Sequence, residues 1–152
     1  SALNKSLMVE HDFIIHADGG ARGNPGPSAI GVVIEGAGIE KKEYGEYIGV
    51  TTNNVAEYQA VIFGLKKLKQ LIGSEKTSES VVEVYADSEL LVKQAIGEYK
   101  VKEPGLQDLF MELWNLRLDF KKVTFEHVMR ENNKEADKMV NYALDREENR
   151  LI

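Results

Sequence analysis

The sequence contains no cysteine, which excludes disulfide bonds, thiolate nucleophiles and cysteine-ligated zinc or iron–sulfur centres. It also lacks both an apolar run near the roughly 20 residues of a membrane-spanning helix and a signal-peptide pattern. Basic residues are fewer than acidic ones, 19 against 25, which is unusual for a protein that binds nucleic acid through a positive face. We therefore expect a cytoplasmic protein with no membrane partner, in which oxygen or imidazole ligands hold any metal.

The composition that remains is that of a globular protein. With 43% hydrophobic and 29% charged residues, a chain of 152 residues has the size of one domain. Residues 1–10 show no apolar periodicity, so we expect a flexible N-terminal segment or an expression remnant there. A single, monomeric domain is expected over residues 11–152.

Apolar runs bounded by glycine and polar residues predict five strands and four helices. The strands are expected at 13–17, 29–35, 40–50, 81–86 and 122–129, the first three as an antiparallel meander. The helices are expected at 53–72, 88–96, 106–118 and 134–146, with a polar loop at 75–80 after the first helix. The fourth strand follows a helical crossover, so it should lie parallel and adjacent to the first.

The most informative stretch is FIIHADGGARGNPGP, residues 13–27, in which an apolar run ends on Asp18 and opens into a glycine-rich loop. Glycines let another backbone approach closely, so this loop could accept a sugar-phosphate chain. Taken alone, however, aspartate before glycine favours an ordinary turn over a catalytic carboxylate. The remaining acidic residues have to decide between the two interpretations.

Three further carboxylates occupy comparable places. Asp87 ends the fourth predicted strand, while Glu57 and Asp137 lie in the first turns of helices and share their stripes with apolar residues. Each has a structural alternative: a capping box with Asn54 for Glu57, an N-cap for Asp87, and helix-dipole complementation for Asp137. Because both helical residues should point towards the sheet, we favour a cluster.

A cluster of carboxylates must take up protons or hold cations, because two such charges 4 Å apart repel by about 4 kcal/mol near a protein surface. Hard oxygen ligands favour magnesium or manganese. Two such ions about 4 Å apart can clamp the attacking and leaving oxygens of a phosphoryl displacement. The acidic residues therefore predict phosphodiester hydrolysis by metal-activated water.

Four segments, DGGARGNPGP, TTNNVAEYQA, YADSELLV and ENNKEAD, closely resemble type 1 ribonuclease H, and the resemblance extends from Phe13 to about Leu144. It implies an α/β, ribonuclease H-like fold: a five-stranded mixed sheet flanked by helices, with strands 4 and 5 parallel to strand 1. It also implies an endonuclease that cuts the RNA strand of RNA–DNA hybrids without sequence specificity, using two Mg²⁺ ions, for which Mn²⁺ can substitute.

The resemblance assigns roles to the four carboxylates by motif position. Asp18 is expected to bridge both ions, Glu57 and Asp87 to hold one of them, and Asp137 to help hold the other. These four residues are the predicted catalytic and metal-binding set.

Substrate contacts are expected from the glycine loop and the start of the first helix. The resemblance implies that Asn24, Asn53 and Asn54 contact the hybrid across its minor groove, where a side-chain amide can both donate to and accept from a 2′-hydroxyl. Gly19 lies in the space through which the RNA backbone would approach, and Thr52 is a candidate for holding a phosphate of the DNA strand. Asn53 and Asn54 are also the expected N-caps of the helix.

Two features depart from the family. Many members carry a histidine in a longer loop before the last helix, whereas His127 is assigned here to the last strand and Arg130 lies nearer the expected place. The basic protrusion of some members is replaced by residues 97–105, which carry only Lys100 and Lys102. We therefore expect weaker hybrid binding than in members that have the protrusion, with a shallow salt dependence because fewer phosphates are neutralised.

Two other function classes are compatible with parts of the pattern. One is a non-catalytic module that binds hybrids through the same fold, although all four carboxylates are present. The other is a glycosidase with two carboxylates, which would need no metal but lacks the aromatic surplus of a sugar-binding cleft.

Overall fold

A computed structural model describes residues 11–150, in which five strands form one mixed sheet of order β3-β2-β1-β4-β5. The strands are β1 (Phe13–Ala21), β2 (Gly26–Gly36), β3 (Lys42–Thr51), β4 (Val81–Ala86) and β5 (Lys122–His127). β1, β2 and β3 are an antiparallel meander, β4 is parallel to β1, and β5 is parallel to β4. The predicted fold class and topology are therefore confirmed.

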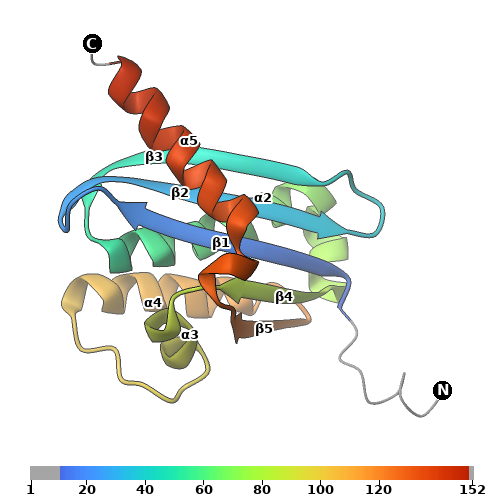
Figure 1. The fold of residues 1–152 in the computed structure, drawn as a ribbon. Helices are drawn as coiled ribbons and strands as arrows, with labels where there is room; N and C mark the ends of the chain where they lie inside the picture. Colours follow the sequence, from blue (N-terminus) through green and yellow to red (C-terminus); the bar gives the residue numbers. More distant parts are fainter. Residues whose placement is uncertain (1–10, 151–152) are drawn as a thin grey trace.

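Helices cover the two faces of the sheet unequally. They are α2 (Asn53–Glu79), α3 (Glu89–Ala95), α4 (Pro104–Arg117) and α5 (Lys134–Arg150), with a 3₁₀ turn η1 (Arg130–Asn132) before α5. α2 and α4 lie on one face, and α5 crosses the opposite face (Figure 1). No helix within residues 11–150 is both long and apolar enough to cross a bilayer.

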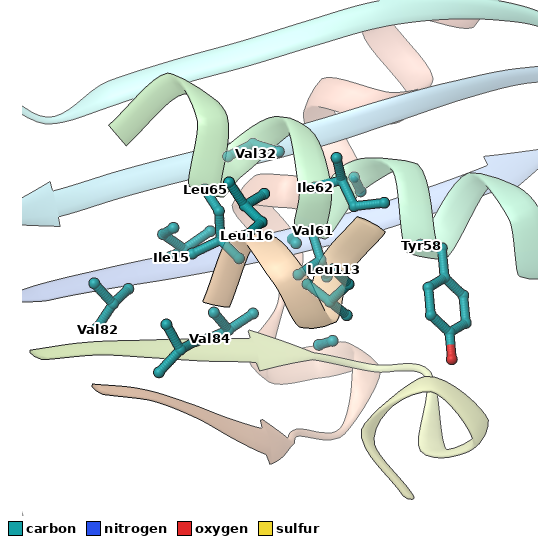
Figure 2. Packing of buried hydrophobic residues seen from close by; sticks show 14 of the residues in the cluster. Ile15, Val32, Tyr58, Val61, Ile62, Leu65, Val82, Val84, Leu113 and Leu116 are labelled. Atoms are coloured by element: carbon teal, nitrogen blue, oxygen red, sulfur yellow. The ribbon is translucent and has the colours of Figure 1, made fainter. Parts of the chain in front are cut away.

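The main hydrophobic core lies between the sheet and the helices α2 and α4 (Figure 2). Alternate residues of β1 point into it, and Ile15 is fully buried against the α2 face, where Gly64 leaves room for it. Val61 and Leu65 of α2 are buried on the same side. Burying each such side chain stabilises the fold by about 1.5–3 kcal/mol, so this layer fixes where α2 begins relative to β1.

Glycines let α5 approach the other face of the sheet. A Cβ on Gly31 of β2 would collide with the backbone of Ala136, and one on Gly45 of β3 would lie 2.5 Å from the Met139 carbonyl oxygen. The backbone of α5 therefore rests directly on two strands. Asp137, in the first turn of this helix, is held close to the sheet as a result.

Several predicted boundaries were wrong. β1 continues beyond Ala17 to Ala21, because its ladder with β2 extends to the pair Ala21–Ser28. The predicted loop at 75–80 is helical up to Glu79, since Gly73 takes a φ of +82° and lets the helix kink and continue. The hydroxyl of Thr77 then donates to the Gly73 carbonyl oxygen at 2.6 Å across this kink. At the other end of the chain, α5 is one turn longer than predicted.

Candidate active site

Asp18 and Asp87 are brought together by the parallel pairing of β1 and β4. The last pair of that ladder is Ala17 with Ala86, so the next residue on each strand is an aspartate. Asp18 is buried inside β1 rather than following it, because only the ladder with β2 continues past this point. The predicted adjacency of the two carboxylates is confirmed.

Glu57 reaches the same point from α2. It lies in the second turn of the helix rather than in the first. One oxygen of its carboxylate and one each of Asp18 and Asp87 lie within 4.8 Å of one another. Gly19 makes this approach possible, since a Cβ there would collide with the backbone of Ala56 and Glu57. In the structure, Gly19 therefore allows β1 to pack closely against α2.

The helix-capping roles considered for Glu57 and Asp87 were wrong. Thr52 is the N-cap of α2, since its Oγ1 accepts the Val55 N–H at 3.3 Å, so neither predicted asparagine caps the helix and no capping box involves Glu57. Ser88 rather than Asp87 caps α3, accepting the Leu91 N–H at 3.2 Å. Both carboxylates are therefore available for another role.

Asp137 faces Asp18 from the first turn of α5, close enough to raise the pKa of Asp18. Its backbone N–H donates to the Asn133 carbonyl oxygen at 3.1 Å. The Asn133 side chain, which is 1% exposed, donates through Nδ2 to the Ala17 carbonyl oxygen at 3.0 Å. Asn133 therefore ties the start of α5 to the residue that precedes Asp18.

The cluster is electrostatically unfavourable without a cation. Burial raises the pKa of Asp18 to about 8, with further contributions from the charges of Asp87 and Asp137. Burial also raises the pKa of Glu57 well above its ordinary value, again helped by neighbouring carboxylates and opposed by a backbone hydrogen bond from Gly19. A bound cation would remove this penalty.

The donor set fits a divalent metal ion. Within the described residues, Oε2 of Glu57 and Oδ1 of Asp87 are buried and have no hydrogen-bond partner. Orphaned buried acceptors are costly, and hard oxygen ligands suit magnesium or manganese. Asp18, Glu57 and Asp87 can hold such an ion, with Asp137 beside them.

The predicted substrate residues surround this cluster. Asn24 Oδ1 accepts the Asn53 N–H at 3.1 Å, and Asn53 Oδ1 accepts the Ala21 N–H at 2.9 Å. These two side-chain oxygens thus hold the glycine loop against the start of α2, which is the turn role that the sequence left open for them. Asn54 is half-buried one residue further along α2.

Arg130 lies next to the carboxylates, and His127 lies at the end of β5. The Arg130 guanidinium, 83% exposed, has its Nε 3.8 Å from Asp87 Oδ2. His127 is the last residue of β5 and is exposed, as its predicted assignment to the strand implies. Arg130 is therefore the cationic side chain that reaches this site from the segment before α5.

A groove of about 500 Å³ lies beyond α3, where some family members carry a basic protrusion. Residues 98–103 form no helix, and Lys100 and Lys102 line the groove together with Glu98 and Glu103. Glu98 is paired with Lys93 of α3 at 2.8 Å. The strength of hybrid binding at this segment stays a prediction.

Two residues that position the site had no usable signal in the sequence. The side chain of Asn133 contacts β1, and nothing in the local sequence indicates this contact. Arg22, in the glycine loop, was not singled out, yet it binds side chains of α5 that lie 119 to 126 positions away. Contacts of such sequence separation leave no local pattern.

The chain matches known proteins over most of its length. The family model described as "Reverse transcriptase-like" matches residues 16–143. A ribonuclease H of Pseudomonas entomophila is 34% identical over 138 residues, covering 86% of this chain and 92% of that protein. A ribonuclease HI of Halobacterium salinarum is 37% identical over 134 residues, covering 86% of this chain and 64% of that protein.

Other relatives are considerably longer. A bifunctional protein of Mycobacterium tuberculosis is 40% identical over 134 residues, which are 87% of this chain but 35% of that protein. The chain therefore spans about a third of the mycobacterial relatives that it matches.

Solved structures agree with the sequence matches. A crystal structure of LC11-RNase H1 in complex with an RNA/DNA hybrid is 46% identical and superposes with a TM-score of 0.81, covering 88% of this chain and 97% of that one. The crystal structure of RNase H1 from Halobacterium salinarum is 34% identical with a TM-score of 0.79 over 88% and 97% of the two chains. With its sheet order, its carboxylate cluster and these relatives, the chain belongs to the ribonuclease H family.

Proposed function

We propose that this chain is an endonuclease that hydrolyses the RNA strand of RNA–DNA hybrids, without sequence specificity, at a site that holds two divalent metal ions. The observation that carries the proposal is the convergence of Asp18, Glu57 and Asp87, whose carboxylate oxygens lie within 4.8 Å of one another. Two of these carboxylates keep a buried oxygen without a partner. The named ribonuclease H relatives support the choice of substrate class.

We assign each carboxylate to a metal ion according to its place in the family motifs. Asp18 would contribute to both metal positions, Glu57 and Asp87 to one of them, and Asp137 to the other. Ions held there would supply charge neutralisation and would lower the pKa of a water molecule; magnesium would serve, with manganese able to replace it. The pKa of Asp18, raised to about 8, indicates that this carboxylate would release a proton as it takes up metal.

Substrate recognition is proposed for the glycine loop and the start of α2. Asn24 and Asn53 use their side-chain oxygens to hold each other's segments, and within residues 11–150 no hydrogen bond engages either Nδ2 group. These Nδ2 groups are therefore positioned to donate to a 2′-hydroxyl oxygen, which RNA has and DNA lacks. Because the side-chain oxygens are already engaged, the two asparagines would act on the 2′-hydroxyl only as hydrogen-bond donors. Thr52 and Asn54 flank them, and Arg130 would lie near the scissile phosphate.

A turnover assay tests the proposal. Excess hybrid with a labelled RNA strand should be cut in magnesium or manganese and left intact in a chelator, while duplex DNA should survive throughout. Asp18→Asn should reduce the rate by a factor on the order of 10³ or more, the scale of losing a central electrostatic group. A wild-type chain that binds hybrid but leaves its RNA intact would instead be the non-catalytic module.

A further inference from the structure

Arg22 connects the glycine loop to the far half of α5. Its Nη1 donates to Glu148 Oε1 at 2.6 Å and its Nη2 donates to Asp145 Oδ1 at 2.7 Å. A third, longer contact of 3.4 Å joins Nη2 to Asn141 Oδ1. These partners follow one another at spacings of four and three residues on α5, so they form a single stripe that faces the guanidinium.

The same loop is held on its other side by α2. The Ala21 N–H donates to Asn53 Oδ1, and the Asn53 N–H donates to Asn24 Oδ1. The backbone between these contacts includes Gly23 with a φ of +95°, and it closes through the Arg22 N–H to the Pro27 carbonyl oxygen at 2.8 Å. The loop therefore bridges two helices, and Arg22 supplies its side-chain attachment to α5.

Attachment through several charge-assisted bonds differs from an ordinary surface pair. A single exposed ion pair contributes little, because ordering two long side chains offsets the attraction. The Arg22 side chain is 34% exposed and meets two carboxylates at once, and the planar guanidinium loses less freedom for each bond formed. These bonds hold the glycine loop in place on α5, and we call this set of contacts the anchor of the loop.

We propose that Arg22 is a positioning residue, which holds the glycine loop on α5 so that Asn24 is preorganised to meet the RNA strand. The substrate part of this inference rests on the function proposed above. The rival explanation is that Arg22 itself binds a phosphate of the hybrid. The two explanations differ in what the carboxylates of α5 do: in the first they complete the anchor, whereas in the second they compete with the substrate.

Paired variants separate these explanations. Arg22→Ala and the double variant Asp145→Asn with Glu148→Gln should each raise the KM for hybrid by about 3–10-fold with kcat within about twofold, because a loosened loop weakens binding but not the chemistry. Combining them should add little, since both remove one anchor. If the double variant leaves KM unchanged or lowers it while Arg22→Ala raises it, Arg22 is a phosphate contact and the proposal is wrong.

A second measurement needs neither hybrid nor metal. Amide hydrogen exchange of the free protein, corrected for the intrinsic rate of each sequence, should become at least about fivefold faster at Ala21 and at residue 22 in both variants, since these N–H groups are hydrogen-bonded in the loop. It should stay unchanged at Ile15 in the core of β1. Unchanged exchange in the loop would overturn the anchor, whereas a wild-type chain that cuts no hybrid would overturn only the proposed function. Exchanging the charges, with Arg22→Glu in an Asp145→Lys, Glu148→Lys background, should restore slow exchange.

A matched control is available on the other face. Lys69 of α2 bonds Asp119 at 2.6 Å in an exposed pair of similar length that has no contact with the loop. Lys69→Ala should change neither the KM nor the exchange of the loop. A comparable effect from this variant would show that loss of any surface ion pair acts on the loop, which also contradicts the proposal.

Discussion

At the scale of single residues, the site is one buried carboxylate among half-buried ones, and their mutual repulsion opposes folding. Asp18 is 6% exposed and lies beside three other acidic side chains, and its pKa is raised to about 8 by burial and by Asp87 and Asp137. Without metal, ionised carboxylates at this site therefore lower the stability of the folded protein. Stability measured without metal should report this directly.

The stability of the metal-free protein should fall as pH rises from about 4 to about 8. The unfolded chain loses the Asp18 proton near pH 3.8, whereas the folded protein keeps it until about pH 8, so the folded state binds more protons in that window. Asp18→Asn removes this term and should raise the melting temperature at pH 8 by roughly 3–6 °C, corresponding to about 1–2 kcal/mol. Thermal denaturation in a chelator at pH 5 and pH 8 measures both effects.

The effect of added magnesium on the wild-type chain can be compared with its effect on Asp18→Asn in the same experiment. Added magnesium should raise the melting temperature of the wild-type chain, because a ligand that binds only the folded state stabilises it, and should raise that of Asp18→Asn much less. A variant that melts at or below the wild-type temperature at pH 8 without metal would mean that the carboxylates do not repel one another.

Asn133 should be necessary for stability, because its buried side chain joins the start of α5 to β1. Asn133→Ala removes the donor to the Ala17 carbonyl oxygen inside a buried environment, so we expect a loss of about 1–3 kcal/mol in the free energy of unfolding. Its neighbour Asn132 is exposed and provides the control, since Asn132→Ala should change stability by less than about 0.5 kcal/mol. Urea denaturation of both variants makes the comparison, and equal losses would contradict the role assigned to Asn133.

At the scale of secondary structure elements, glycines set the distances between strands and helices. Gly19→Ala should destabilise the protein by about 2–4 kcal/mol, because its Cβ would collide with the backbone of α2 rather than with a movable side chain. It should also reduce cleavage, since Asp18 and Glu57 would be pushed apart. Gly105, which has nothing within 4 Å of an added Cβ and lies within α4, is the matched control.

The control should behave oppositely. Gly105→Ala should leave activity unchanged and stabilise the protein slightly, by up to about 1 kcal/mol, because alanine favours the helix. Chemical denaturation and hybrid cleavage of the two variants test the pair. Similar losses in both would show that the close approach of β1 and α2 is not the cause.

Elements also show which features the sequence could predict. The adjacency of Asp18 and Asp87 followed from one helical crossover between parallel strands, a rule that depends on topology alone. The N-cap of α2 did not follow, because Thr52, Asn53 and Asn54 can all cap a helix. The choice is settled by Asn53, whose side chain is engaged by the Ala21 N–H of the glycine loop.

The features that were missed depend either on a local choice that the sequence leaves open or on a distant partner. The continuation of α2 past Gly73 rests on a local kink, which glycine permits but does not require. The anchoring of Arg22 depends on Asp145 and Glu148, more than 120 positions later in the chain. In contrast, the convergence of Asp18, Glu57 and Asp87 could be expected, because the strand and helix patterns around each of them are local.

At the scale of the whole molecule, the net charge of −6 sets how the hybrid should be bound. Among the described residues, the cations assigned here to hybrid binding are Arg130, beside Asp87, and Lys100 and Lys102, which line the groove next to α3. Each neutralised phosphate contributes a slope of about −0.9 to the dependence of log affinity on log salt. We therefore expect a slope no steeper than about −3 for this protein.

Hybrid binding titrated at several salt concentrations tests this expectation, with calcium in place of magnesium to limit cutting. Replacing both Lys100 and Lys102 by alanine should make the slope shallower by up to about 2, because two phosphate contacts are lost. A slope steeper than about −3 in the wild-type chain would show that other cations bind the phosphates. An unchanged slope in the double lysine variant would show the same.

The distribution of the four carboxylates along the chain has a consequence for synthesis. They occupy positions 18, 57, 87 and 137, and the last of them belongs to α5, which crosses the face of the sheet opposite α2 and α4. A chain emerging from the ribosome therefore carries three of the four proposed ligands long before the fourth appears. If Asp137 helps to hold a metal ion as proposed, the full set of ligands forms only when α5 docks on the sheet.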